Sequence, residues 1–476
     1  MRKAFIFLTG LFGFTFAQEN LQDLKRQLEE HRKLIQELER KIQSLEKAQQ
    51  SKPEEKKELT KPEPADRSLQ LRAKFDERLR AYQVSPFRQT AFLPDISFIL
   101  DFSAVARNRK DKEYEELVIP RLWHRHEHNG HGHALLNDKR GFNLNYGELY
   151  LYAPVDPYFD LYATIPFSED GAEIEEAYAV TRGLPGGLQL KVGKFRSGFG
   201  RLNAQHPHAW DFATQPLPNK VFLGDDGLVE KGIGINWLAP TPFYLLFGLE
   251  VLQGENDQSF GYKGFTITDP NNPSNTFEIG DKPVPNLYVG YMKTSFDLGR
   301  LSVLTGLSYA QGKHRHAHDD HGLDAKTKLY GFDLTARYQI DSVRYLALQG
   351  EYMWRDQDGT RYGFNNAGNV TTAKIDRKQA GFYAQLVGRF HKQWRAGVRY
   401  ELINKNDVKR NGTALWAPDN LPAYYAMLEY TPTEFSRIRL QVGENRAFYE
   451  GQKRKPVKEV ILQFNFAIGA HGAHPF

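Results

Sequence analysis

Over most of the chain, apolar and polar side chains alternate with the period of two that is typical of β-strands. In the last such segment, Leu462, Phe464 and Phe466 alternate with Gln463 and Asn465. An apolar face backed by amides is typical of a strand with one side against lipid and the other against a wet lumen. The pattern therefore predicts strands that face a membrane.

About sixteen such segments follow one another, joined by connections that are alternately short and long. The segments are 95–106, 142–153, 158–167, 173–182, 187–198, 228–239, 242–253, 285–297, 300–311, 327–340, 343–355, 375–390, 393–403, 422–431, 435–447 and 458–468. The longest expected loops are 107–141, 199–227, 254–284, 312–326, 356–374 and 404–421. An even strand number with short turns at one end and long loops at the other is typical of outer-membrane barrels.

We therefore predict an all-β transmembrane β-barrel of about 16 antiparallel strands over residues 95–476, preceded by an N-terminal α-helical coiled coil. The chain ends on Phe476, which resembles the terminal aromatic residue of bacterial outer-membrane barrels. An even strand number places the coiled coil and the C-terminus on the same, periplasmic side of the outer membrane.

The N-terminal part of the chain has a different pattern. Residues 1–17 have two basic residues, a short apolar core and Thr-Phe-Ala before Gln18, which predicts a signal peptide. Within 18–47, apolar residues recur in heptads, which predicts a periplasmic coiled coil and favours a homotrimer. Residues 48–94 are charged and contain prolines at first, so we interpret them as a linker and the approach to the barrel.

Composition supports the barrel prediction and limits the chemistry. The 476 residues combine a mean hydropathy of −0.59 with 13% aromatic residues, and no apolar run of helical-span length follows the N-terminus. A net charge of +5 with no dominant basic patch does not suggest nucleic acid as a partner. The absence of cysteine excludes disulfides and thiolate sites, and leaves His, Asp and Glu as metal ligands.

Most of the histidines fall in four clusters, three of which lie in expected long loops. The candidate metal ligands in these three are His124, His126, His128, His131, His133, His206, His208, Asp211, His314, His316, His318, Asp319, Asp320 and His321. Closely spaced imidazoles and carboxylates favour zinc, and also nickel, copper or cobalt. We predict Zn²⁺ or another divalent transition metal as a ligand or transported ion, with flexible loops that bind metal incidentally as the alternative. The fourth cluster, His471 and His474, is expected on the periplasmic side.

The connection 199–227 contains aromatic residues among its charged ones, so we expect it to be packed and to fold inward, narrowing the lumen. Charges near it could form a constriction with Asp225 and Asp226 opposite. The candidate constriction residues are Lys191, Lys194, Arg196, Arg201, Glu173 and Glu175. Two alternatives remain: the connection closes over the barrel or packs on a neighbouring subunit, and the two glutamates pair with nearby basic residues.

An enzyme is not predicted. Ser197 and His206 are close only in sequence, and the chain has no G-x-S-x-G motif.

The runs 171–212 and 224–255, and above all 195–212 (FRSGFGRLNAQHPHAWDF), resemble a known family. It is a family of Gram-negative outer-membrane barrels often labelled zinc-regulated or TonB-dependent outer-membrane receptors, or porin-like proteins. The resemblance covers most of 94–476, and it implies a barrel with His-rich loops and a connection to zinc supply. A TonB-dependent receptor has about 22 strands around a plug, so the length of this barrel favours the porin-like label.

Together these observations predict an outer-membrane, porin-like channel that assists divalent metal (zinc) acquisition through His-rich extracellular loops. The alternative is a general or anion/phosphate-preferring porin whose histidines are incidental. In either case the coiled coil could tether the outer membrane to peptidoglycan or another periplasmic partner.

Overall fold

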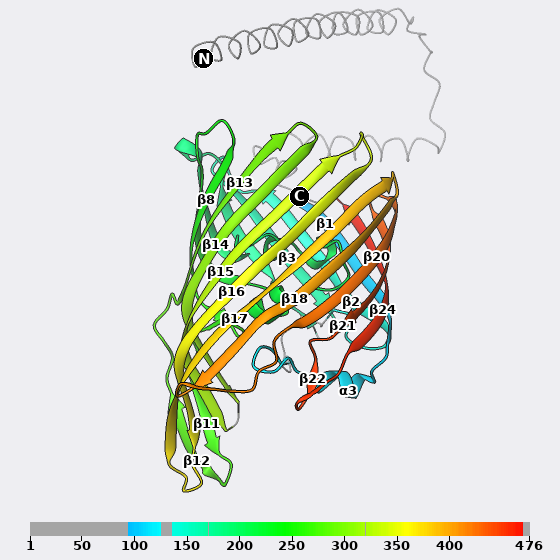
Figure 1. The fold of residues 1–476 in the computed structure, drawn as a ribbon. Helices are drawn as coiled ribbons and strands as arrows, with labels where there is room; N and C mark the ends of the chain where they lie inside the picture. Colours follow the sequence, from blue (N-terminus) through cyan, green and yellow to red (C-terminus); the bar gives the residue numbers. More distant parts are fainter. Residues whose placement is uncertain (1–93, 125–135, 170, 319, 470–476) are drawn as a thin grey trace, which may run out of the picture. The chain divides into compact units, whose positions relative to one another are not determined.

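A single antiparallel sheet forms most of the part of the chain that the computed structural model describes, which is residues 94–124, 136–169, 171–318 and 320–469 (Figure 1). The sheet has 18 strands, of which β4 (Gly171–Ala172) and β19 (Thr413–Ala414) contain only two residues each. The remaining sixteen are β1 (Asp95–Arg107), β2 (Gly141–Pro154), β3 (Phe159–Ser168), β5 (Glu176–Thr181), β6 (Leu188–Arg196), β7 (Val229–Leu238), β8 (Tyr244–Leu252), β13 (Leu287–Leu298), β14 (Leu301–His318), β15 (His321–Gln339), β16 (Tyr345–Phe364), β17 (Val370–His391), β18 (Trp394–Arg410), β20 (Leu421–Thr433), β21 (Ser436–Asn445) and β24 (Val457–Gly469).

The sheet closes into a barrel because its first strand pairs with its last. β1 is antiparallel to β2 on one side and to β24 on the other, with Asp101 opposite Asn465 and Phe102 opposite Phe464. Closure gives each of the sixteen main strands two neighbours. Backbone N–H and C=O groups in lipid have no water to bind, so they must pair with neighbouring strands. The predicted barrel of about 16 antiparallel strands is confirmed.

Side chains alternate between the two sides of the wall as the sequence predicted. On β24, Gln463 and Asn465 are buried inside, and both donate to the Asp101 carboxylate at 2.8 Å. Phe466 and Ile468 lie on the outside with exposed fractions of 48% and 68%. Polar groups inside the wall therefore satisfy one another, and apolar groups face outward.

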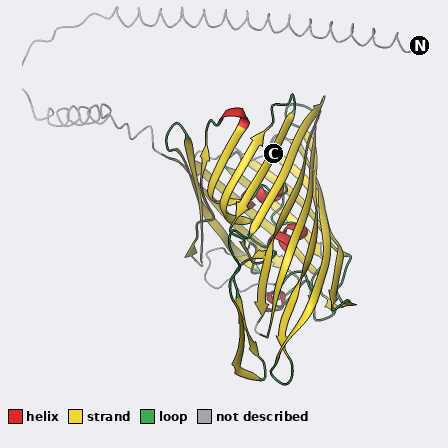
Figure 2. Cartoon of the chain, turned by 90° about the vertical axis from the view of Figure 1, so that its left-hand side faces the viewer, coloured by secondary structure: helices red, strands yellow, loops and turns green. Residues whose placement is uncertain are grey.

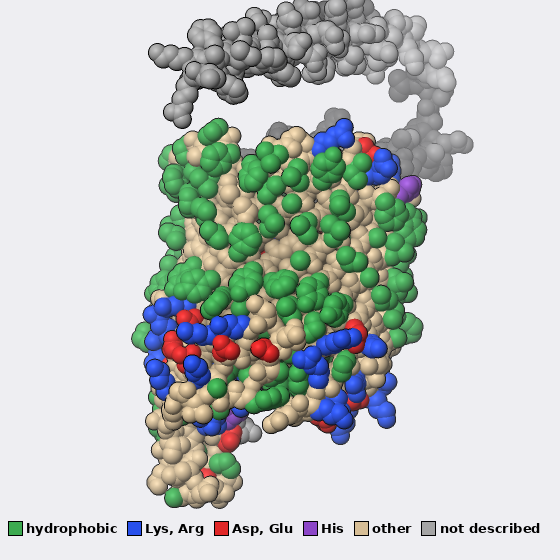
Figure 3. Space-filling model, viewed as in Figure 1, with side chains coloured by type: hydrophobic (Ala, Val, Ile, Leu, Met, Phe, Trp, Pro, Cys, Tyr) green, Lys and Arg blue, Asp and Glu red, His purple; other side chains and the backbone are tan. Residues whose placement is uncertain are grey.

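The outer wall is suited to a bilayer. Figure 3 shows hydrophobic side chains covering the visible face of the barrel, with Lys, Arg, Asp and Glu gathered mainly toward one end. An apolar band flanked by charged residues is the surface of a membrane-spanning barrel. None of the helices in the described residues is long and apolar enough to cross a membrane.

The two ends of the barrel differ. At one end, here called the turn end, successive strands join through short connections, such as those that follow β2, β13 and β15. At the other, here called the loop end, lie the helix α3 (Asp111–Glu115) and three small hairpins (Figure 1). The hairpins are β9 (Glu255–Asn256) with β10 (Phe260–Gly261), β11 (Phe265–Asp269) with β12 (Asn272–Ile279), and β22 (Tyr449–Glu450) with β23 (Lys453–Arg454).

Three expected long loops are instead partly or largely strand, and that part of the prediction was wrong. β14 and β15 continue their pairing as far as His318 opposite His321, β16 and β17 as far as Phe364 opposite Val370, and β18 to Arg410. Polar strands can extend a ladder where the neighbouring strand extends equally, since each added residue pair gains backbone hydrogen bonds. The sequence therefore showed that these segments are polar, but not that they pair as extensions of the neighbouring strands.

The connection between β6 and β7 folds into the barrel, where its helices are visible behind the strands in Figure 2. It contains two short 3₁₀ turns, η3 (Leu202–Ala204) and η4 (Pro207–Ala209), and the helix α4 (Leu217–Leu223). Glu351 on β16 accepts the backbone N–H of Leu202 at 2.9 Å and the Asn219 side chain at 2.8 Å. The connection is packed and inward-folded, as its aromatic content predicted.

The signal peptide 1–17, the coiled coil 18–47, most of the linker 48–94 and the terminal residues His471, His474 and Phe476 lie outside the described residues. Their assignments remain predictions.

The membrane-facing wall can be tested with Leu249, which lies on β8 with an exposed fraction of 68%. We expect Leu249→Arg to lower the free energy of unfolding in phospholipid vesicles by about 2–4 kcal/mol, because it places a charge against hydrocarbon. Leu298→Arg, at the turn end of β13, is the matched control with an expected cost of about 0–1 kcal/mol. Equal costs for the two variants in urea titrations would contradict the proposed position of the bilayer.

Candidate functional site

A cavity of about 430 Å³ at the loop end is lined by all the described histidines of two predicted clusters. We call it the loop-end cavity. Its charged and imidazole-bearing lining residues are His124, His314, His316, His318, His321, Arg121, Arg355, Arg361, Arg377, Arg410 and Asp257. Among the described residues, five imidazoles and five guanidiniums thus surround one space beside a single carboxylate.

Strand periodicity explains one side of the cavity. His314, His316 and His318 alternate along β14, so they share one face of the strand. His318 is opposite His321 at the end of the β14–β15 ladder, where Asp320 lies 2.6 Å from the His321 Nδ1. The described part of the His-rich segment therefore forms a hairpin with a defined register.

The other side of the cavity is the segment that follows β1. There, a bridge between Ile119 and Trp123 turns the chain, and both side chains are buried. The Trp123 ring packs edge-on against Phe448 at 6.0 Å between centroids, and Lys220 lies over its face at 4.4 Å. These contacts anchor the residue immediately before His124.

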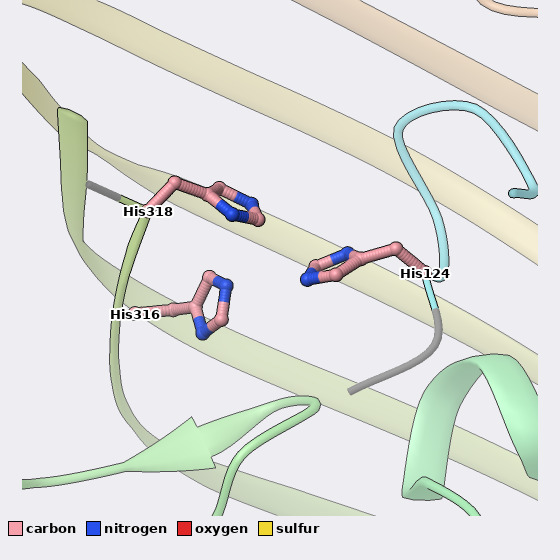
Figure 4. Close-up of side chains that lie close together, drawn as sticks. All are labelled: His124, His316 and His318. Carbon is pink, nitrogen blue, oxygen red and sulfur yellow. The ribbon is translucent and has the colours of Figure 1, made fainter. Parts of the chain in front are cut away.

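His124, His316 and His318 form a triad whose rings point toward one another (Figure 4). The ring centroids are 4.6 Å apart for His124 and His318, 5.4 Å for His124 and His316, and 4.9 Å for His316 and His318. One nitrogen from each ring lies within 4.8 Å of the other two. Three ligands of a tetrahedral zinc ion are about 3.4 Å apart when Zn–N is about 2.1 Å, so small side-chain rotations would suffice to bind an ion.

The guanidiniums of the cavity form no ion pair with the acidic residues that the structure describes. They belong to Arg121, Arg355, Arg361, Arg377 and Arg410. Neutral amides hold two of them instead: Arg355 donates to Gln379 at 2.6 Å, and Arg377 donates to Gln357 at 3.0 Å. Because amides carry no charge, the described lining of the cavity carries an excess of positive charge.

A second group, here called the lumen cluster, joins the inward-folded connection to the wall. His206 Nε2 is 2.8 Å from Glu176 on β5, and its Nδ1 is 3.3 Å from Glu175 and 3.7 Å from Glu148 on β2. His208 Nδ1 is 3.5 Å from the same Glu148. Burial by itself lowers the pKa of His206, but the carboxylates of Glu148 and Glu175 outweigh this effect and raise it well above the ordinary 6.5.

The prediction that His206, His208 and Asp211 form one metal-binding cluster was partly wrong. Asp211 does not join His206 and His208: it forms an ion pair with Arg395 at 2.9 Å and accepts from Gln385 at 3.0 Å. The η4 turn, which contains His208, lies between His206 and Asp211, and the aspartate contacts another part of the wall. His206 and His208 likewise do not line the loop-end cavity.

The predicted constriction residues are engaged in local pairs. Lys194 lies 3.0 Å from Glu173, and Arg196 pairs with Glu175. The predicted strand 173–182 was too long at its start, because β5 begins only at Glu176, so Glu173 and Glu175 lie before the strand.

The remaining charges near the connection also have neighbours close by. Lys191 lies over the Tyr178 ring at 4.7 Å, and the backbone N–H of Arg201 donates to Glu351. Asp225 pairs with Lys220 at 2.8 Å, and Arg196 donates to the Asp226 carbonyl at 3.1 Å. These pairs leave no row of opposed, uncompensated charges among these residues.

Sequence reasoning missed the arginines of the loop-end cavity and Glu148 and Glu176 of the lumen cluster. Glu148 could have been found, because it is a carboxylate on an inward position of an otherwise aromatic strand. The arginines could not, since they lie on four separate segments that only the barrel brings together. Four predicted ligands, His126, His128, His131 and His133, and also Asp319, lie outside the described residues.

Comparison with known proteins shows one relative over the full length. A protein of Aquifex aeolicus (strain VF5), described as an "uncharacterized protein", is 60% identical over 483 residues that cover 100% of both chains. The chain belongs to the family of this protein. No family model matches the sequence.

Several solved structures resemble the barrel at low identity. They include the outer-membrane expressed OmpT of Vibrio cholerae (10% identical, 79% of this chain and 98% of that one, TM-score 0.46) and the outer membrane channel DcaP of Acinetobacter baumannii (11%, 79% and 97%, 0.46). Another is an anion-selective porin from Comamonas acidovorans (12%, 79% and 99%, 0.43). The closure of this chain's barrel is established by its own strand pairing.

The lumen cluster predicts a pH dependence. A raised pKa means that the protonated His206 stabilises the folded connection, fully below pH 6.5 and less as the pH rises through the raised value. We expect the amide protection factors of 199–224 to fall at alkaline pH, and His206→Gln to remove this fall. His391→Gln, an exposed histidine at the turn end, is the control. An unchanged pH profile in the His206 variant, measured by hydrogen exchange, would show that the cluster does not hold the connection.

Proposed function

We propose that the protein is an outer-membrane, porin-like channel that assists the acquisition of a divalent transition metal, with zinc as the first candidate. The observation that carries this proposal is the His124, His316 and His318 triad in the loop-end cavity. The closed barrel and its apolar outer wall support a channel in the membrane. The metal is cargo in this proposal, and the protein needs no cofactor.

The chemistry of the triad suits temporary binding. Zinc accepts imidazole nitrogen readily, and a site with three protein ligands leaves a fourth position open for water or another ligand. An open position allows ligands to exchange, which release of the ion requires. Nickel, copper and cobalt share the preference for imidazole, so the triad by itself does not select among these metals.

The proposal also covers the orientation of the chain in the membrane and its oligomeric state. The even strand number supports a periplasmic location for the coiled coil 18–47 and the C-terminus, with the loop end outside the cell. The heptads in 18–47 support a homotrimer, and the charged linker could let the coil reach peptidoglycan or another periplasmic partner. We propose no enzymatic activity: Ser197 donates its hydroxyl to Glu250, and His206 lies among glutamates.

Removing two members of the triad tests metal capture. We expect His316→Gln with His318→Gln to weaken the tightest zinc site of the purified full-length protein by at least about tenfold, since mutating even the outer partners of a metal ligand costs about 10–100-fold. Isothermal titration in detergent measures this affinity, and His391→Gln is the matched control. Zinc affinity equal to that of the wild type would refute the triad as the site.

A second candidate function is an anion-preferring porin, including one that prefers phosphate. The observation that favours it is the set of five guanidiniums around the loop-end cavity with a single carboxylate, Asp257. A positive potential at a channel entrance raises the local concentration of anions and lowers that of cations. In this candidate the histidines would be incidental.

Reversal potentials in planar bilayers separate the two functions. Under a potassium chloride gradient, an anion-preferring porin should show clear anion selectivity that added zinc leaves unchanged. The metal-acquisition proposal predicts that zinc shifts the reversal potential or reduces conductance, and that the His316 and His318 double variant loses this response. Strong anion selectivity with no zinc response in the wild type would favour the second function over the first.

A further inference from the structure

The loop-end cavity presents two kinds of recognition chemistry at once. The triad of His124, His316 and His318 offers three imidazole nitrogens within 4.8 Å of one another. The same cavity is lined by five guanidiniums, which attract carboxylates and phosphates and repel cations. A free divalent cation satisfies only the first of these groups.

Charge argues against a free ion as the preferred form of the cargo. Arg355 and Arg377 are held by the neutral side chains of Gln379 and Gln357, and no described carboxylate forms an ion pair with either of them. Among the lining residues that the structure describes, only Asp257 is acidic. A divalent cation entering alone would add positive charge to a cavity that already has an excess of it, at low local dielectric.

Size leads to the same conclusion. A volume of about 430 Å³ is far larger than one metal ion needs, and it falls in the range of about 300–1,000 Å³ that small-molecule pockets occupy. Three imidazoles also leave at least one coordination position of zinc unfilled. A small organic ligand could fill that position, occupy the remaining space and supply negative charge.

We propose that the loop-end cavity takes up the metal as an anionic complex with a small polycarboxylate. The imidazoles of the triad would complete the coordination of the metal, and the guanidiniums of Arg361, Arg410 and their neighbours would bind the carboxylates that point away from it. This inference rests on the proposed metal function and narrows its substrate to a chelated ion.

The proposal can be tested with equilibrium dialysis of the purified, untagged full-length chain in detergent. The probes are zinc alone, zinc nitrilotriacetate, which is anionic, zinc triethylenetetramine, which is cationic, and nitrilotriacetate without metal. We expect the anionic complex to bind at least about tenfold more tightly than the cationic one, because one charge-assisted hydrogen bond contributes about that factor. Nitrilotriacetate without metal should bind more weakly than its zinc complex.

Two variants separate the roles of the groups. Arg361→Gln with Arg410→Gln should abolish the preference for the anionic complex and leave zinc alone bound as in the wild type or more tightly. His316→Gln with His318→Gln should reduce binding of zinc and of the anionic complex together. Arg300→Gln, at the turn end, is the matched arginine control. A variant in which His126, His128, His131 and His133 become Gln should keep the preference, which excludes the neighbouring histidines as its source.

The outcomes distinguish this inference from the function on which it rests. If zinc alone binds through the triad but the two complexes bind equally, the inference is overturned and metal capture stands. If nitrilotriacetate binds equally with and without zinc, and the His316 and His318 variant has no effect, both are overturned in favour of an anion site. Heat-modifiable migration in gels checks that each variant barrel has folded.

Discussion

The closure of the barrel between β1 and β24 is the constraint on which the rest of the structure depends. A backbone surrounded by hydrocarbon must pair all its N–H and C=O groups within the protein, and only a closed sheet leaves no edge. Closure then fixes which side chains face lipid and which face the interior. The Asp101 carboxylate, which accepts from Gln463 and Asn465 across the seam, shows how the interior side is satisfied by polar groups from both ends of the chain.

A barrel of sixteen strands encloses more space than its wall side chains fill, and here the connection between β6 and β7 occupies part of it. Its attachment is mainly polar. Glu351 accepts hydrogen bonds from Arg201, Leu202 and Asn219, and His206 lies among Glu148, Glu175 and Glu176. Buried carboxylates are costly unless they are paired, so these contacts hold the connection to the wall in a defined position. The lumen cluster is thus explained by the need to attach this segment.

The loop-end cavity differs from the lumen cluster in its charge balance. In the lumen cluster, histidine and arginine face carboxylates in comparable number, whereas the described imidazoles and guanidiniums of the cavity face one described aspartate. A group of like charges without opposite charges nearby destabilises the fold. Such a group therefore favours a role in binding a ligand of opposite charge. The triad and the arginines together favour a ligand with both a metal centre and negative groups, and this is the reason for joining metal capture and anion preference in one proposal.

The sequence by itself determined the barrel. Alternation with a period of two, an even number of segments and short turns alternating with longer connections predicted sixteen strands, and predicted an inward-folded connection at 199–227 from its aromatic residues. These features are local, so they can be read along the chain. Only the tertiary structure decided which polar residues meet: His124 beside His316 and His318, Asp211 with Arg395 rather than with His206, and the five arginines around one cavity. Such contacts depend on strand register and on the closure of the sheet, which join segments far apart in the sequence and leave no periodic trace in it.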